Sequence, residues 1–124
     1  MMKQIRIVVP ALLITVMGAA AAWAAGGSTT VKGYVIDSSC TFTKDLKKPI
    51  SPECAVACAK AGSPLVIQTA AGTVYLPIDD TQPAKSQNER LMPYAGQLVS
   101  VTGKVYTKGG AHAIVIEKIE AGGK

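Results

Sequence analysis

The residues best suited to chemistry in this sequence are its three cysteines, which all lie between residues 37 and 61. Cys40 stands in the segment Asp37-Ser-Ser-Cys, and Cys54 and Cys58 follow in the pattern C-x-x-x-C. Three thiols close together can form a disulfide, bind a soft metal ion or exchange with other disulfides. Which of these occurs depends on the compartment, because disulfides persist mainly outside the reducing cytosol.

A disulfide from Cys40 to Cys54 or to Cys58 is the first interpretation. Either bridge closes a loop of about 14 to 18 residues, which would stabilise a small domain by about 3 kcal/mol. If Cys40 pairs with Cys58, the free thiol is Cys54 near a helix N-terminus, where the helix dipole lowers the thiol pKa. If Cys40 pairs with Cys54, we expect Cys58 to be buried and inert. A Cys54–Cys58 bridge along one helix would be strained.

The alternative is a soft-metal site or a thiol-redox site that uses all three cysteines. Cu(I) or Zn(II) accepts thiolate ligands and would need a fourth ligand. The candidates for that fourth ligand are Asp37, Met92 and His112. The spacing matches no zinc-finger pattern, and the C-x-x-C motif of thioredoxin-like enzymes is absent.

The two later cysteines are predicted to lie on one helix. Ser51 is a suitable N-cap, Pro52 suits the first helical position, and Gly62 suits the residue just past the helix end. Helical spacing places four residues on the face expected to pack on the rest of the domain. These residues are Cys54, Ala57, Cys58 and Ala61. The three sulfurs are therefore expected to lie close together.

Alternating apolar residues predict five strands around these elements. The expected strands are 29–37, 65–69, 73–76, 97–106 and 111–120. Gly33 and Gly103 indicate bends or close backbone approaches inside two of them. A short helix is expected to open with the capping box Ser86 to Glu89 and to end at Pro93. A Cys-bearing helix between strands 1 and 2 and a short helix between strands 3 and 4 complete the element order of a five-stranded OB-fold, a Greek-key barrel.

The N-terminus has the form of a signal peptide over residues 1–24, followed by a single domain over 25–124. Lys3 and Arg6 precede an apolar run, and Ala22-Trp23-Ala24 is a small-x-small cleavage site. Retention of the run as a membrane anchor is the alternative. We therefore expect a periplasmic or secreted protein, released by cleavage near Ala24, in a compartment where cysteines can pair.

Several short motifs resemble those of small exported bacterial OB-fold-like proteins that contain cysteines. The motifs are G-Y-V-x-D-x-x-C from Gly33 to Cys40, the C-x-x-x-C pair, and LMPYAGQLVSVTGKV from Leu91 to Val105. The resemblance covers nearly all of residues 25–124. It implies the fold and the compartment, and it implies no catalytic residue, since that group has no assigned activity.

Composition and the remaining motifs favour a binding protein over an enzyme. The net charge is +5, and about +3 without Lys3 and Arg6, which is too little to indicate nucleic-acid binding. His112 is the only histidine, and no G-x-S-x-G, phosphate-loop or dinucleotide motif occurs.

Oligonucleotide- and oligosaccharide-binding OB-folds use strands 2 and 3 and the adjoining loops. Here that face would offer Tyr75 together with Lys44, Lys47 and Lys48. The sequence thus predicts an exported non-enzymatic binding module without a cofactor. Its partner would be a small ligand, an envelope polymer or another protein.

Overall fold

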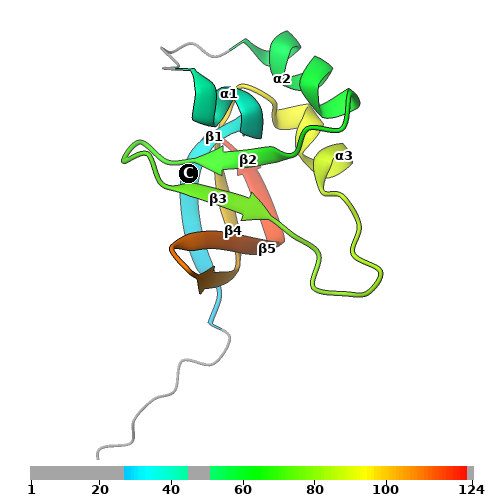
Figure 1. The fold of residues 1–124 in the computed structure, drawn as a ribbon. Coiled ribbons are helices and arrows are strands. Elements are labelled where there is room, and N and C mark those ends of the chain that lie inside the picture. The colour runs from blue at the N-terminus through cyan, green and yellow to red at the C-terminus, as the bar shows by residue number, and fades with distance from the viewer. Residues whose placement is uncertain (1–26, 45–50, 123–124) are drawn as a thin grey trace, which may run out of the picture.

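The computed structural model describes residues 27–44 and 51–122, which form five strands, three short helices and one 3-10 turn (Figure 1). In chain order the elements are β1 (Thr29–Asp37), α1 (Ser38–Thr43), α2 (Pro52–Lys60), β2 (Leu65–Gln68), β3 (Val74–Pro77), α3 (Asn88–Leu91), η1 (Met92–Tyr94), β4 (Leu98–Lys108) and β5 (Ala111–Ala121). The predicted signal peptide, residues 1–24, lies outside the described residues.

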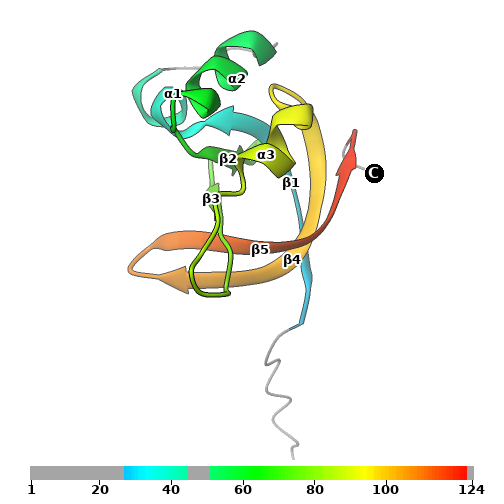
Figure 2. The same ribbon diagram turned by 90° about the vertical axis from the view of Figure 1, so that its right-hand side faces the viewer.

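The five strands close into a barrel in the order β1-β2-β3-β5-β4, with β4 pairing back onto β1. All neighbouring strands are antiparallel except β3 and β5, which run parallel. Figures 1 and 2 show α1, α2 and α3 gathered at one end of the barrel, away from the β4–β5 turn. The predicted mainly β chain with a five-stranded barrel is confirmed.

Two glycines allow the strands to approach closely enough for the barrel to close. A Cβ atom on Gly33 would lie 2.6 Å from the carbonyl oxygen of Gln68 on β2. A Cβ atom on Gly103 would overlap the carbonyl oxygen of Val115 on β5, beside a register shift between Thr102 and Gly103. The predicted close approaches at Gly33 and Gly103 are thus confirmed, because no larger side chain fits at either place.

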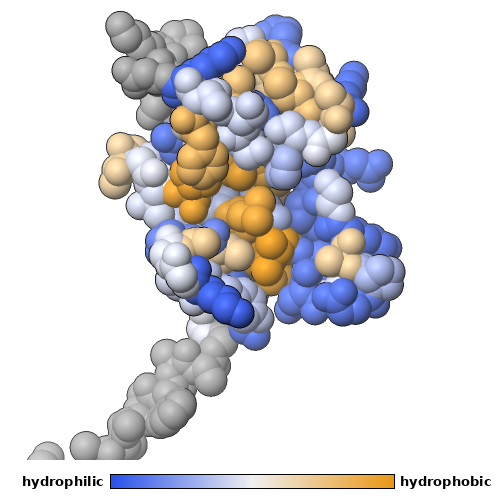
Figure 3. Space-filling model, viewed as in Figure 1, coloured by the Kyte–Doolittle hydropathy of each residue, from blue (hydrophilic) through white to orange (hydrophobic). Residues whose placement is uncertain are grey.

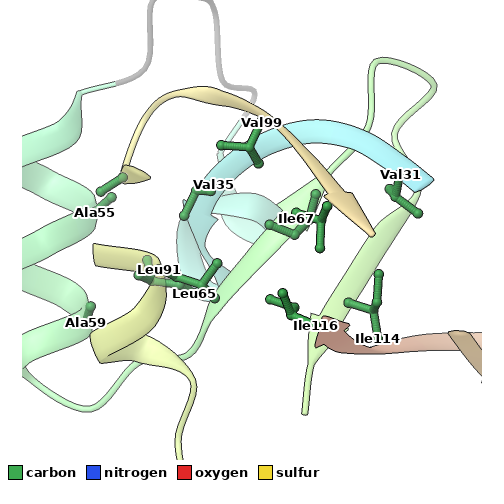
Figure 4. Close-up of a cluster of buried hydrophobic side chains, with 12 residues drawn as sticks. Val31, Val35, Ala55, Ala59, Leu65, Ile67, Leu91, Val99, Ile114 and Ile116 are labelled. Carbon is green, nitrogen blue, oxygen red and sulfur yellow. The ribbon is translucent and has the colours of Figure 1, made fainter. Parts of the chain in front are cut away.

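The core fills the barrel and continues under α2. Val35, Ile67, Val99 and Val101 of three different strands are completely buried. Figure 4 shows Ala55 and Ala59 of α2 directed at the end of this core, near Leu65 and Leu91.

The prediction that the face with Cys54 and Cys58 packs on the barrel is therefore wrong. Ala55 and Ala59 are buried, whereas Cys54 and Ala57 are exposed and Cys58 is half-buried. The predicted face and the observed face both consist of small residues at helical spacing. The sequence pattern therefore does not show which of the two is buried. The alanines fit closely over the barrel end, and the cysteines consequently lie on the flank of the helix.

The two other helices also differ from expectation. α1 was not predicted as a helix, although Asp37 is a regular N-cap residue for it. α3 begins after Gln87, without the expected capping box, and the Ser86 hydroxyl accepts a hydrogen bond from the Asn88 amide instead. Pro93 does not end the helical segment, because it lies inside the 3-10 turn η1.

The glycine contacts lead to a first prediction. Gly103→Ala should lower the free energy of unfolding by about 1–3 kcal/mol, because the added methyl group has to displace the β5 backbone. Denaturant unfolding measures the loss. Gly27→Ala is the control: a Cβ there meets nothing within 4 Å, so its effect should stay within about 0.5 kcal/mol. Equal stability of the two variants would contradict the close approach.

Candidate functional site

The first candidate site is built around the carboxylate of Asp37, which ends β1 and is only 1% exposed. Its Oδ1 accepts a hydrogen bond from the amide of Cys40 at 2.8 Å, and its Oδ2 accepts one from the amide of Ser39 at 3.2 Å. The hydroxyl of Ser63, in the turn before β2, also donates to Oδ2. Asp37 thereby caps α1 and ties it to the start of β2.

These contacts keep the buried carboxylate ionised. Burial alone raises the pKa of Asp37, but hydrogen bonds from Ser63, from the Cys40 thiol and from the two capping amides outweigh it. The net pKa lies below the ordinary value of 3.8. A carboxylate that accepts several hydrogen bonds is stabilised in its charged form.

Cys40 lies in the middle of α1 with its thiol hydrogen-bonded to Asp37. That hydrogen bond, together with burial and the negative charge of Asp37, raises the pKa of the Cys40 thiol from 9.0 to about 11. The thiolate is the nucleophile and the metal ligand in cysteine chemistry. Cys40 therefore stays protonated, and so a poor nucleophile, to a higher pH than an ordinary thiol.

The two cysteines of α2 differ in exposure. Cys54 is exposed at the third helical position, and its amide donates to the Ser51 hydroxyl, which caps the helix as predicted. Cys58 is half-buried one turn later and is hydrogen-bonded to Cys54. Burial, followed by the charge of Asp37, raises the pKa of the Cys58 thiol.

A small cavity of about 180 Å³ brings two of the cysteines together. Cys40 and Cys54 form part of its wall, with Asp37 and Lys44 beside them. All three cysteines are free thiols in this structure. We call Asp37, Cys40, Cys54 and the adjoining Cys58 the thiol site.

The proposed metal ligands are not assembled in the described part of the chain. Within residues 27–44 and 51–122, no group of three or more His, Cys, Asp or Glu side chains is placed to hold a metal ion. Asp37 serves as a helix cap, Met92 packs against the core, and His112 stands on β5 with its ring against Tyr75. Copper or zinc binding thus stays a prediction from sequence.

The second candidate site is an apolar groove with a volume of about 700 Å³ on the outer face of β2 and β3. Figure 3 shows hydrophobic surface gathered there, at the centre of the view. Among the described residues that line it, none is Asp, Glu, Lys or Arg. These lining residues are Ser38, Phe42, Val66, Ala71, Gly72, Thr73, Val74, Leu76, Gly109, Gly110, Ala111 and His112.

The groove has two walls and a floor, which come from separate parts of the chain. Phe42 of α1 is 77% exposed and forms one wall, and Leu76 of β3, 41% exposed, lies on the strand face between the walls. Gly109 and Gly110, in the turn between β4 and β5, form the opposite side. The sequence analysis did not identify Phe42 or Leu76, although Phe42 is the only phenylalanine and lies between residues 37 and 61, where all three cysteines are found.

Of the ligand face predicted from sequence, the structure describes Lys44 and Tyr75, and neither lines the groove. Lys44 lines the thiol cavity, and Tyr75 packs against the core with its ring centroid 5.3 Å from that of His112. Tyr75 points away from the groove because Val74 and Leu76, its neighbours along the strand, supply the outward side chains. Lys47 and Lys48 lie outside the described residues.

Comparison of the chain with models of protein families, with curated proteins and with solved structures gave no match. Nor does the part of the chain described here contain a helix that is both long and apolar enough to span a bilayer.

The Asp37 contacts lead to a prediction for Asp37→Asn. Loss of the buried charge should lower the pKa of the Cys40 thiol from about 11 toward 9.0 and should destabilise the fold by about 1–3 kcal/mol. Alkylation of Cys40 by iodoacetamide, followed by mass spectrometry as a function of pH, measures the first effect. Asp79→Asn is the control, because Asp79 accepts similar hydrogen bonds from Thr81 and Lys85 in a loop far along the chain. Unchanged alkylation in Asp37→Asn would contradict the thiol–carboxylate contact.

The raised pKa of Cys40 also predicts a loss of stability in alkali. The folded state holds the thiol proton more tightly than the unfolded state, so this contribution is complete below pH 9.0 and disappears as the pH rises through about 11. Under reducing conditions, the stability advantage of the natural chain over Cys40→Ala should therefore shrink across that window. Denaturant unfolding at a series of pH values measures it. An advantage that stays constant across the window would show that the thiol titrates alike in both states.

Proposed function

We propose that this protein is an exported, non-enzymatic binding module with an OB-fold-like architecture. The closed five-stranded barrel and its parallel β3–β5 pairing support the OB-fold assignment. The order of elements supports it as well, with α2 between β1 and β2 and α3 between β3 and β4.

The position of the apolar groove is the observation that carries the proposal. OB-folds bind their ligands on the face of strands 2 and 3, between the connection of strands 1 and 2 and that of strands 4 and 5. The groove has these same boundaries, with Phe42 in the first connection and Gly109 and Gly110 in the second. Its volume of about 700 Å³ is also in the range of about 300–1,000 Å³ common for ligand sites.

The chemistry of the groove favours an uncharged, apolar segment of another protein as the ligand. Nucleic acids and anionic polymers need basic residues to neutralise their charge, and the described lining has none. Val74 and Leu76 instead offer aliphatic side chains, and Phe42 adds an exposed aromatic ring. Burying apolar side chains against these residues is favourable by about 25 cal/mol per Å² of apolar surface.

The three cysteines fit a role outside the cytosol in this proposal. Export directed by residues 1–24 would place them in an oxidising compartment, where Cys40 can form a disulfide with a cysteine of α2. Such a bridge would tie the connection between β1 and β2 to the barrel. A second candidate function, thiol–disulfide exchange, is favoured by the exposed Cys54 with Cys58 beside it.

The proposed groove predicts the behaviour of two matched variants. Leu76→Ser should weaken binding of an apolar peptide about 5- to 30-fold, since it removes a partly exposed leucine from the groove. Leu98→Ser is the control, because Leu98 is 38% exposed, close to the 41% of Leu76, and does not line the groove. Fluorescence anisotropy with a labelled decapeptide of alternating valine and threonine measures the binding.

A second decapeptide, with lysine or aspartate in place of valine, tests the chemistry of the ligand. We expect it to bind much more weakly to the natural chain than the apolar peptide does. Equal loss of binding in both leucine variants, or preference for a charged peptide, would contradict the groove as the binding face. Self-association of the chain with Leu76 in the contact would identify a second copy as the occupant and would equally overturn the proposal.

A further inference from the structure

The short helix α1 belongs to both candidate sites. Cys40 lines the thiol cavity, while Ser38 and Phe42 of the same helix line the groove. Figures 1 and 2 both show α1 beside α2. A movement of α1 as a unit would therefore shift Cys40 and Phe42 together.

Few contacts hold α1 in place. The helix has six residues and no buried side chain, and its N-terminus is fixed by the Asp37 cap. The Ser38 amide also donates to the carbonyl of Pro64 at 2.9 Å. Helices this short are marginal by themselves, so α1 depends on these attachments at its first turn.

We infer that Cys40 and Cys54 are a modification site for a low-molecular-weight disulfide, and that the bridge they form fixes α1 and with it the Phe42 wall of the groove. The effect on ligand binding rests on the function proposed above, whereas the bridge and its effect on α1 do not. Reduced protein would present a loosely held groove wall, and oxidised protein would present a fixed one.

The surroundings of the three thiols favour this pairing over the other two. Cys40 and Cys54 share the wall of one cavity, and Cys58 is not part of that wall. Cys54 is the exposed thiol and can be reached by a reagent from solution. A bridge between Cys54 and Cys58 would join residues one turn apart on a single helix, where disulfide geometry is strained.

The reaction is two consecutive thiol–disulfide exchanges. The Cys54 thiolate attacks one sulfur of the reagent RSSR, whose S–S bond breaks, and the leaving RS⁻ takes up the proton that Cys54 lost. Cys40 then loses its proton and attacks the Cys54 sulfur of the mixed disulfide, and a second RSH leaves. Two protein thiols are oxidised and one RSSR is reduced to two RSH, while Cys58 stays a thiol.

The bridge would link α1 covalently to α2, which is itself packed firmly against the core. α2 is anchored in the core by Ala55 and Ala59, so a covalent link to Cys54 holds the middle of α1 as well as its first turn. The same link removes the hydrogen bond that the Cys40 thiol donates to Asp37, but the two capping amides keep their contacts with the carboxylate. A groove wall ordered in advance loses less conformational freedom when a ligand binds.

The test compares the full-length chain treated with oxidised glutathione and the same chain treated with a phosphine reductant. Peptide mapping by mass spectrometry should find Cys40 linked to Cys54 and Cys58 free. Hydrogen exchange of the amides of residues 38–44 should slow at least several-fold in the oxidised form. The apolar decapeptide should bind about 2- to 10-fold more tightly to that form, as expected when one or two side chains are ordered beforehand.

Two serine variants are the matched controls. Cys58→Ser should respond to oxidation like the natural chain, and Cys40→Ser should show neither slower exchange nor tighter binding. A Cys40–Cys58 or Cys54–Cys58 linkage would overturn the pairing. A Cys40–Cys54 bridge with unchanged exchange in residues 38–44 would overturn the link to α1. Slower exchange without peptide binding in either form would support the hold on α1 and would contradict only the proposed binding function.

Discussion

The buried carboxylate of Asp37 is the interaction on which the candidate sites depend. An ionised group that is 1% exposed is tolerated only when hydrogen bonds replace the water it has lost. Here the donors are the capping amides of Ser39 and Cys40, the hydroxyl of Ser63 and the thiol of Cys40. One side chain thus starts α1, attaches it to the turn before β2 and raises the pKa of the neighbouring Cys40 thiol. The Phe42 wall of the groove and the position of Cys40 both follow from this cap.

The barrel supplies the rigid support that this arrangement needs. Closure leaves no free strand edge between β1 and β4, and the contacts at Gly33 and Gly103 bring the strand backbones unusually close. The outward residues of β2 and β3 are consequently held in fixed positions between two connections. The floor of the groove is therefore rigid, since the strand backbone itself holds Val74 and Leu76 in place.

The thiol site and the groove share helix α1, which supplies Cys40 to the first and Phe42 to the second. In the proposal, the groove binds an apolar protein segment, and the redox state of Cys40 and Cys54 sets how firmly one of its walls is held. The protonated state of Cys40 is compatible with this role, because a thiol that is a poor nucleophile reacts only after Cys54 has formed a mixed disulfide. The cysteines would then regulate binding without themselves touching the ligand.

Local patterns in the sequence were sufficient for the strands, for the start of α2 at Ser51 and Pro52, and for the two glycine contacts. Strand alternation, helix capping and the lack of a glycine side chain act over a few neighbouring residues, so the sequence determines them directly. The inward face of α2, the burial of Asp37 and the apolar groove depended on the tertiary structure. In the sequence, the alanine face and the cysteine face of α2 are equally apolar. Only the shape of the barrel end selects between them, and it accommodates Ala55 and Ala59. Phe42, Leu76 and Gly109 come from three separate segments, so only closure of the barrel made them neighbours.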